Sequence, residues 1–292
     1  MPDSVIGEAQ NSRASLDLLR AQRRLYSQAK STGNARLAVV AVGAVATVVA
    51  SAVLPWVSSA VAGGVGGVLL VYSLAFSGRE KSKAKQAAAV QEQFDCELFG
   101  LPWSMLVERP TPAVIFDAAT TGDTSTTQMQ DWYPDVGGVQ RPFDVLLCQR
   151  SNLGWGATLH RQWAAVTALL AATALIVLAA LVVLLDAPAG AFVALLAPLR
   201  ESIELVRAHQ ASAAAKASLD GRVMTTWRDA LTGAEQDWEP RLREVQTCVL
   251  QQRLTNASVP DWYHRRRRPV LETSMRAATD ALRAQVEPPA QP

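Results

Sequence analysis

The stretch Trp163–Leu185, WAAVTALLAATALIVLAALVVLL, decides the class of this protein because it carries no charged side chain. At about 1.5 Å of rise per residue, a helix of this length crosses the roughly 30 Å hydrocarbon core of a bilayer with some tilt. The sequence therefore predicts a membrane-spanning helix here.

A short turn leads into a second apolar segment, AGAFVALLAP, at Ala189–Pro198. Arg200, Glu201 and Glu204 follow before this segment is long enough to cross a bilayer. As a helix, residues 187–199 cover only about 20 Å. We expect a short fourth span that carries these charges toward the inner leaflet or thins the bilayer around them.

These charges permit two interpretations. Charged groups in a membrane normally face a bundle interior or a water-filled path, which makes Arg200, Glu201 and Glu204 candidates for the inner mouth of an opening. Arg200 and Glu204 lie one helical turn apart and can neutralise each other. Pro198 weakens the helical hydrogen-bond ladder and is a candidate hinge. The alternative is that the charges only mark the cytoplasmic interface.

A second long apolar block lies nearer the N-terminus. The chain as a whole is 49% hydrophobic and 18% charged, but no Lys or Arg occurs at 37–78 or at 162–199. Leu37–Leu54 and Val57–Phe76 are each long enough to span, with Pro55-Trp56 between them. The sequence thus predicts two transmembrane hairpins, which makes four spans.

The basic residues set the orientation. If the turns Pro55-Trp56 and Asp186–Pro188 are external, all 28 Lys and Arg residues fall on the other side of the membrane. The positive-inside rule makes that side cytoplasmic. Both termini and the central segment 78–161 are therefore expected in the cytoplasm.

Small residues recur every four positions on the first hairpin. Ser59, Gly63 and Gly67 form one such row, and Gly43 starts another with Thr47 and Ser51. Rows of this kind let helix backbones approach closely in lipid. Gly63 and Gly67 are candidate packing residues, either within the hairpin or between subunits.

Outside the spans, apolar residues keep a helical spacing of three and four, as in Leu242, Val245 and Val249, and regular strand alternation is absent. The predicted fold class is an all-α membrane protein of two transmembrane helical hairpins with helical cytoplasmic segments. The expected organisation is a cytoplasmic amphipathic helix in 1–36, hairpins at 37–77 and 162–206, cytoplasmic helical segments at 78–161 and 207–287, and a disordered tail at 288–292.

Nothing in the sequence indicates catalysis or a bound metal. The chain has no HExxH, no Gly-rich phosphate loop and no GxSxG. Its three cysteines, Cys96, Cys148 and Cys248, are widely spaced and contain no CxxC, which argues against disulfides and a zinc site. We expect no enzymatic activity, no cofactor and no metal.

Several cytoplasmic side chains suit an anionic, base-bearing ligand. Arg150, Asn152 and Trp155 place a guanidinium, an amide and an indole close together just before the third span. Trp103, Trp132 and Tyr133 add aromatic faces. Stacking aromatics beside arginine fit a nucleotide-like anion. The alternative is that these aromatics fill a small core.

A basic run, Asp261-Trp262-Tyr263-His264 followed by four arginines at 265–268, echoes the earlier Asp131-Trp132-Tyr133. Such a run can lie on anionic headgroups or bind a specific ligand. DNA or RNA binding is not expected from one run of four.

Four motifs occur in order along nearly the whole chain: Phe94-Asp95-Cys96 through Gly100-Leu101-Pro102-Trp103, then Asp131-Trp132-Tyr133-Pro134, Cys148-Gln149-Arg150-Ser151-Asn152-Leu153, and Leu195-Leu196-Ala197-Pro198. On these residues, the chain resembles the SMODS-associating four-transmembrane effector family. The Cys-Gln-Arg-Ser-Asn-Leu run is the most specific of them.

The resemblance implies a multi-pass effector of the bacterial inner membrane. It would act in cyclic-oligonucleotide-based anti-phage signalling (CBASS), responding to a messenger made by a neighbouring nucleotidyltransferase. It would open the membrane as a homo-oligomer and so cause abortive infection. Its expected partners are the lipid bilayer, that messenger and further copies of the same chain.

Two other classes remain open from the residues alone. One is a small ligand-gated channel or transporter, although a transporter is expected to show interrupted helices in both halves, and only the fourth span is unusual here. The other is a membrane-anchored sensor or scaffold without a pore, which would not need charge inside the fourth span.

Overall fold

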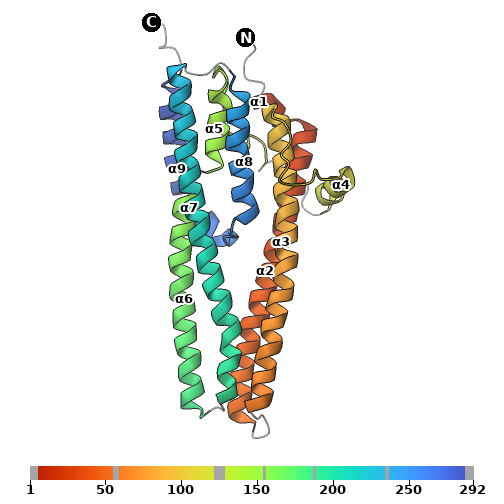
Figure 1. The fold of residues 1–292 in the computed structure, drawn as a ribbon, viewed down its shortest axis with the longest axis vertical. Coiled ribbons are helices and arrows are strands. Elements are labelled where there is room, and N and C mark those ends of the chain that lie inside the picture. Colours follow the sequence, from red (N-terminus) through yellow and green to blue (C-terminus); the bar gives the residue numbers. More distant parts are fainter. Residues whose placement is uncertain are drawn as a thin grey trace. The chain divides into compact units, whose positions relative to one another are not determined.

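The computed structural model describes residues 6–54, 59–121, 129–153, 156–186, 189–233 and 237–286. Every element in this part of the chain is a helix (Figure 1), so the all-α prediction is confirmed. The helices are α1 (Ile6–Ala9), α2 (Arg13–Val53), α3 (Ser59–Phe99), α4 (Pro112–Thr120), α5 (Phe143–Ser151), α6 (Gly156–Leu184), the 3-10 helix η1 (Ala189–Leu195), α7 (Leu196–Thr232), α8 (Glu239–Thr255) and α9 (Asp261–Arg283). Trp155, the turn Pro55-Trp56 and the predicted disordered tail at 288–292 lie outside the described residues.

The chain divides into two compact units. We call the first, made of Met1–Tyr26, Lys85–His160 and Ala211–Pro292, the head unit. We call the second, made of Ser27–Ala84 and Arg161–Gln210, the span unit. The long helices α2, α3 and α7 each contribute residues to both.

The head unit has an apolar core supplied by the helices α2, α3, α5, α7 and α8. Its largest fully buried side chains include Trp227, Phe94 and Phe99. The helical spacing on α8 places Leu242, Val245 and Val249 in this core, with at most 4% of their surface exposed, as the sequence predicts. The head unit thus gathers its apolar side chains in one buried core.

The span unit instead exposes apolar side chains. On α6, Leu169 and Ile176 are each 69% exposed and Leu184 is 78% exposed. Among the described residues, three helical stretches are long and apolar enough to cross a membrane: Arg13–Val53, Ser59–Phe99 and Phe143–Leu184. Apolar surface on this scale is stable in lipid but not in water.

The apolar halves of α2 and α3 run side by side (Figure 1) and meet at small residues. A Cβ added to Gly43 would lie 2.7 Å from Cδ2 of Leu69. Thr47 and Ser51, in the same predicted row, are each 7% exposed. Gly43 therefore packs within the hairpin, and Thr47 and Ser51 are buried on the same helix.

Gly63 and Gly67 behave differently. A Cβ added to either of them meets no atom of the described chain within 4 Å. The contact on α3 falls on Gly66 instead, where a Cβ would lie 2.8 Å from the backbone of Val193 and Ala194 in η1. Packing of Gly63 and Gly67 between subunits stays a proposal.

The predicted fourth span does not begin as an α-helix. Residues Ala189–Leu195 form the 3-10 helix η1, and α7 starts at Leu196. Because Gly66 lets η1 approach α3 backbone to backbone, the tighter and thinner 3-10 winding fits at this contact. Pro198 is the third residue of α7, in the first turn, where a missing N–H costs no helical hydrogen bond.

Candidate functional site

In the span unit, the carboxylate of Glu201 is held by side chains from two other helices. Glu201 lies on α7 and is 4% exposed. Its two oxygens accept hydrogen bonds from Arg36 on α2 and from Ser73 on α3. Arg200 donates a third, with Nη1 3.0 Å from Oε1 of Glu201. We call Glu201 and its partners the span cluster.

The arginines of the span cluster each have a second carboxylate. Arg36 Nη2 lies 3.2 Å from Oε2 of Glu80, and Arg200 Nη2 lies 2.6 Å from Oε1 of Glu204. The Arg200–Glu204 pair is the one predicted from their spacing. The side chains of Glu80 and Glu204 are 27% and 50% exposed, against 5% for Glu201. Each arginine thus lies between one buried and one more exposed carboxylate.

A small hollow of about 160 Å³ borders this cluster between α2 and α7. It is lined by Leu37, Val40, Ala41, Pro198, Glu201, Ser202 and Leu205. Of the predicted pore residues, Pro198 and Glu201 line the hollow, whereas Arg200 and Glu204 lie on the neighbouring part of α7. The hollow holds a few water molecules at most and is too small to be a conduction path within one chain.

The head unit contains a second set of buried charges, which we call the head cluster. Glu92 and Asp95, one turn apart on α3, are both fully buried. Arg243 and Arg253 on α8 pair with them, each at 2.6 Å. Gln246 Nε2 bridges the two carboxylates, 2.9 Å from Glu92 and 2.8 Å from Asp95.

Neutral groups extend the head cluster to other segments. Tyr133 donates its hydroxyl proton to Asp95 over 2.6 Å, and Asn152 donates to the Tyr133 oxygen over 2.9 Å. Gln149 Nε2 donates to Gln246 Oε1 over 3.2 Å. Burial, together with the Asp95 carboxylate, raises the pKa of Tyr133 well above its ordinary value, so the hydroxyl stays a donor.

The electrostatics keep Arg253 charged. Burial alone would lower the pKa of Arg253, but the adjacent Asp95 and Tyr133 raise it above its ordinary value. Lys216 on α7 shows the opposite balance, because burial and the positive charge of Arg253 lower its pKa to about 8. The head cluster thus favours the charged form of Arg253 and disfavours that of the neighbouring Lys216.

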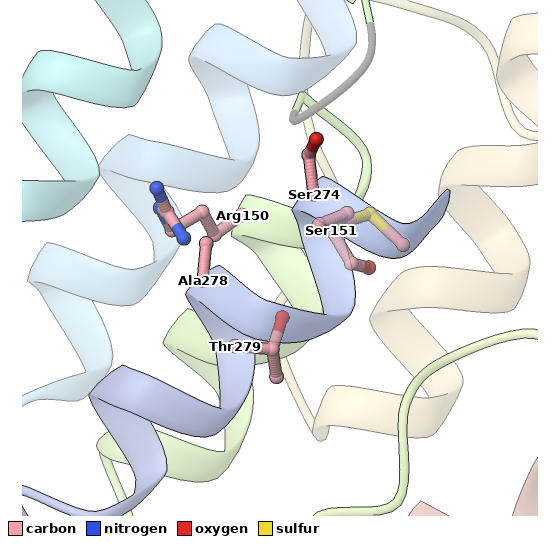
Figure 2. Close-up of a pocket in the computed structure, with 6 residues that line it drawn as sticks. Arg150, Ser151, Ser274, Ala278 and Thr279 are labelled. Atoms are coloured by element: carbon pink, nitrogen blue, oxygen red, sulfur yellow. The ribbon is translucent and has the colours of Figure 1, made fainter. Parts of the chain in front are cut away.

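The predicted ligand-binding residues have separate partners in the structure. Arg150 Nε lies 3.0 Å from Oδ1 of Asp220. With Ser151, it lines a hollow between α5 and α9 (Figure 2) that also includes Ser274, Met275, Ala278 and Thr279. The hollow measures about 80 Å³, whereas pockets for small ligands measure roughly 300–1,000 Å³. It does not accommodate a nucleotide in this conformation.

The predicted aromatics also differ from one another. Tyr133 is 1% exposed and belongs to the head cluster with Asn152. Trp103 donates its indole N–H to the carbonyl of Val107 over 3.0 Å, and the Arg109 guanidinium lies 5.1 Å from its ring centroid. Trp132 remains 39% exposed. The structure thus joins Asn152 to Tyr133 but gives Arg150 and Trp103 other contacts.

Sequence reasoning missed most members of both clusters. They are Arg36, Ser73 and Glu80 in the span unit and Glu92, Asp95, Arg243, Gln246 and Arg253 in the head unit. The available signal was a polar residue at a position where the helical spacing calls for an apolar one, as at Gln246 beside Val245 and Val249. From the sequence, Arg36 is only one of the 28 Lys and Arg residues that indicate the cytoplasmic side.

Comparison with known proteins places the chain in a family. A sequence model described as the SMODS-associating 4TM effector domain matches residues 4–282. A "probable CBASS effector molecule" of Bacillus cereus (strain VD146) is 24% identical over 169 residues, which cover 54% of this chain and 56% of the relative. The chain thus spans little more than half the length of that curated relative. No solved structure matches the chain. Together with the motifs and the apolar helices, the family match shows that the chain belongs to the SMODS-associating 4TM effector domain family.

Proposed function

We propose that this chain is a CBASS effector of the bacterial inner membrane, which oligomerises and permeabilises the membrane when a cyclic oligonucleotide signals phage infection. A neighbouring nucleotidyltransferase would supply that messenger. The family match supports the effector role, and the name of the Bacillus cereus relative supports the link to CBASS. The exposed apolar helices of the span unit support residence in lipid.

The proposed topology has four spans with both termini in the cytoplasm. Three spans correspond to the apolar parts of α2, α3 and α6, and the fourth is η1 with the first turn of α7. At about 2 Å per residue, a 3-10 helix covers more distance than an α-helix of equal length, which helps a short segment to cross. The predicted boundaries of the two hairpins and the cytoplasmic segments form part of this proposal.

The span cluster is the observation that carries the proposal. A carboxylate buried beside apolar spans is costly unless it is paired, and such groups usually mark a path for ions or water. In one chain, Glu201 is satisfied by Arg36 and Ser73. In a ring of subunits, α7 would turn its charged face, with Arg200, Glu201 and Glu204, toward a shared water-filled axis.

Several chains are needed because the helices of one chain fill their own centre. The open surface at Gly63 and Gly67 is the proposed contact between subunits, since small residues there admit a neighbouring helix at close range. Pro198, at the start of α7, is the proposed pivot for that helix.

The messenger would bind the head unit near Arg150, Asn152 and Trp155, with Trp103, Trp132 and Tyr133 as further candidates. Because the hollow beside Arg150 is too small for a nucleotide, binding requires α5 and α9 to separate or a second subunit to complete the site. Either event couples the ligand to a change in the head unit.

Ion flux through proteoliposomes tests this function. We expect dye release and ion current from the purified full chain only with one member of a panel of cyclic oligonucleotides. Glu204→Lys, at a half-exposed position, should shift the cation-to-anion preference by several-fold, because the charge lies at the inner mouth. Glu239→Lys, the same change on an exposed part of α8, is the matched control and should leave the preference unchanged.

Two outcomes of the same experiment would contradict the proposal. Equal ion preference in Glu204→Lys and Glu239→Lys would place the opening away from α7. An absence of flux with every ligand, from protein that is folded and oligomeric, would favour a sensor or scaffold without a pore.

A further inference from the structure

The first turns of α9 form an exposed face that combines apolar and basic side chains. Trp262 is 57% exposed and Val270 is 67% exposed. Arg266 lies between them at a spacing of four, which puts all three on one side of the helix. Arg265 and Arg267 are exposed as well. We call residues 262–270 the α9 basic face.

This face is strongly positive. Residues 262–270 read WYHRRRRPV and contain four arginines and no acid. Within the described part of the chain, no carboxylate pairs with Arg265, Arg266 or Arg267. The helix also has a buried side, since Tyr263 is 7% exposed. The exposed Arg267 lies next to this residue, with its guanidinium 5.9 Å from the Tyr263 ring centroid.

Contacts inside the head unit locate the start of α9 along α7. The backbone N–H of Ala257, four residues before α9, donates to Ser212 Oγ over 3.0 Å. Ser212 follows Arg207 by five residues, which is about 8 Å of helix. The end of the charge-bearing border of the fourth span and the start of α9 are therefore close along the same helix.

The third span also begins a short distance along the chain from the head unit. A Cβ added to Gly156, the first residue of α6, would lie 1.9 Å from Cδ of Lys216, four residues beyond Ser212 on α7. The uncharged stretch of α6 begins seven residues later, at Trp163, or about 10 Å along the helix. Ser212 and Gly156, which carry these head-unit contacts, are thus only five residues of chain from Arg207 and seven from Trp163.

We propose that the α9 basic face binds the anionic phospholipid headgroups of the same bilayer that holds the span unit, an inference that rests on the proposed membrane placement. Arginine pairs with lipid phosphate bidentately, and exposed tryptophan prefers the headgroup layer. A cluster of basic residues next to a span draws anionic lipid over a distance of about a Debye length. Negative headgroups thereby become ligands of the head unit, and the lipid composition of the membrane sets how firmly α9 is held.

A fluorophore on α9 tests the proposal in the full-length protein. The variant Val270→Cys, made with Cys248→Ser, carries an environment-sensitive dye and is reconstituted in phosphatidylcholine bilayers with increasing phosphatidylglycerol. We expect the emission to shift toward the blue as phosphatidylglycerol rises, and 0.5 M NaCl to reverse the shift. Arg266→Glu should raise the phosphatidylglycerol fraction for the half-maximal shift at least about fivefold, the effect expected for one lost basic contact.

Arg276→Glu is the matched control, because Arg276 is exposed on the same helix ten residues further from the spans. It should leave the half-maximal fraction unchanged. An emission that ignores phosphatidylglycerol, or equal effects of Arg266→Glu and Arg276→Glu, overturns the proposal. So does a shift produced in neutral bilayers by a short RNA or a soluble cyclic oligonucleotide, which would make α9 a nucleotide-binding face instead.

Carbonate extraction separates this inference from the proposed function. A labelled chain that stays in the membrane but does not sense phosphatidylglycerol contradicts only the α9 proposal. A chain that carbonate releases from the membrane contradicts both, since the span unit would not then lie in lipid.

Discussion

The head unit and the span unit both bury carboxylates against arginines from other helices, but they complete the pairing in different ways. In the head cluster, Asp95 meets Arg253 together with the neutral donors Tyr133 and Gln246. Among the described residues, the second carboxylate that Arg253 and Gln246 approach is Glu92, which is itself fully buried. In the span cluster, Glu201 shares Arg36 with Glu80 and shares Arg200 with Glu204.

This difference decides what each cluster can do. A carboxylate saturated by neutral and charged donors has one low-energy arrangement, and removing any member leaves a buried group unsatisfied. An arginine that contacts two carboxylates at once keeps one of them when it loses the other. The head cluster therefore fixes a fold, whereas we interpret the span cluster as one that can exchange partners.

The largest effect should come from the head cluster. Asp95→Asn removes the negative charge that pairs with Arg253, whose side chain is 7% exposed. In the described part of the chain, the next carboxylate is that of Glu92, at 4.0 Å. We expect a loss of about 3–5 kcal/mol, the cost of breaking a buried ion pair, measured by thermal unfolding in detergent. Glu97→Gln, the same carboxylate-to-amide change at an exposed position of α3, should stay near the parent. A parent-like melting temperature for Asp95→Asn would remove the head cluster from the stability argument.

Glu201→Gln should cost less, about 1–3 kcal/mol, although Glu201 is almost as buried. Arg36 and Arg200 keep Glu80 and Glu204 as partners, so neither is left uncompensated. If Arg36 can exchange partners, removing both of its carboxylates should cost more than removing each one separately. Glu80→Gln with Glu201→Gln leaves Arg36 without a carboxylate and should lose more than the sum of the two single variants in a double-mutant cycle. Strict additivity would show that Arg36 does not exchange partners.

Packing in the span unit gives a third, matched pair of variants. Gly66→Ala places a methyl group 2.8 Å from the backbone of η1, which cannot move aside as a side chain can, so we expect a loss of about 1–3 kcal/mol. Gly63→Ala meets no neighbour within 4 Å and gains helix propensity, so it should be neutral or slightly stabilising. Equal melting temperatures for the two variants would mean that η1 does not pack on Gly66.

The proposed subunit contact can be separated from this packing. Gly63→Leu with Gly67→Leu should leave the melting temperature of the single chain near the parent. It should reduce cross-linked oligomers in membranes, because the bulky side chains block close approach. Undiminished oligomers would move the subunit contact to another face.

The smallest effect concerns pH. The folded-state pKa of Lys216 is about 8, below its ordinary 10.5, so between these values the unfolded chain binds a proton that the folded chain does not. The free energy of unfolding should therefore rise with pH from 8 to 10.5 because of this group. Lys216→Met should flatten that rise relative to the parent and stabilise the head unit at pH 7, in melting curves taken at pH 7, 8, 9 and 10. Parallel curves for parent and variant would show that the lysine is well solvated.

The features that were predicted from sequence are those that local spacing reports. The apolar span in α6, the packed row at Gly43, the pair Arg200–Glu204 and the buried face of α8 all follow from residues three or four apart. The partners of Glu201 do not, because Arg36 and Ser73 lie 165 and 128 positions away. Which side chains meet across such distances depends on the rotation of each helix about its axis. A rotation of about 100°, the turn per residue, would bring the neighbouring residue into the contact instead.

The choice of Gly66 over Gly63 and Gly67 has the same origin. All three glycines lie on α3, and only the position of η1 decides which of them faces a neighbour. The 3-10 winding of η1 was also beyond prediction, because 3-10 runs of seven residues are uncommon and the close contact with Gly66 cannot be read from local spacing.

The winding of η1 determines both how far α7 extends along its axis and how α7 is rotated about that axis. A 3-10 helix turns about 120° per residue and rises about 2.0 Å, whereas an α-helix turns 100° and rises 1.5 Å. Over the 7 residues of η1, a change to α-helical winding would shift α7 about 3.5 Å along its axis and rotate it by about 140° about that axis. A rotation of that size carries Glu201 from one side of α7 to nearly the opposite side, away from Arg36. The winding of η1 therefore determines which face of α7 meets the other helices of the span unit.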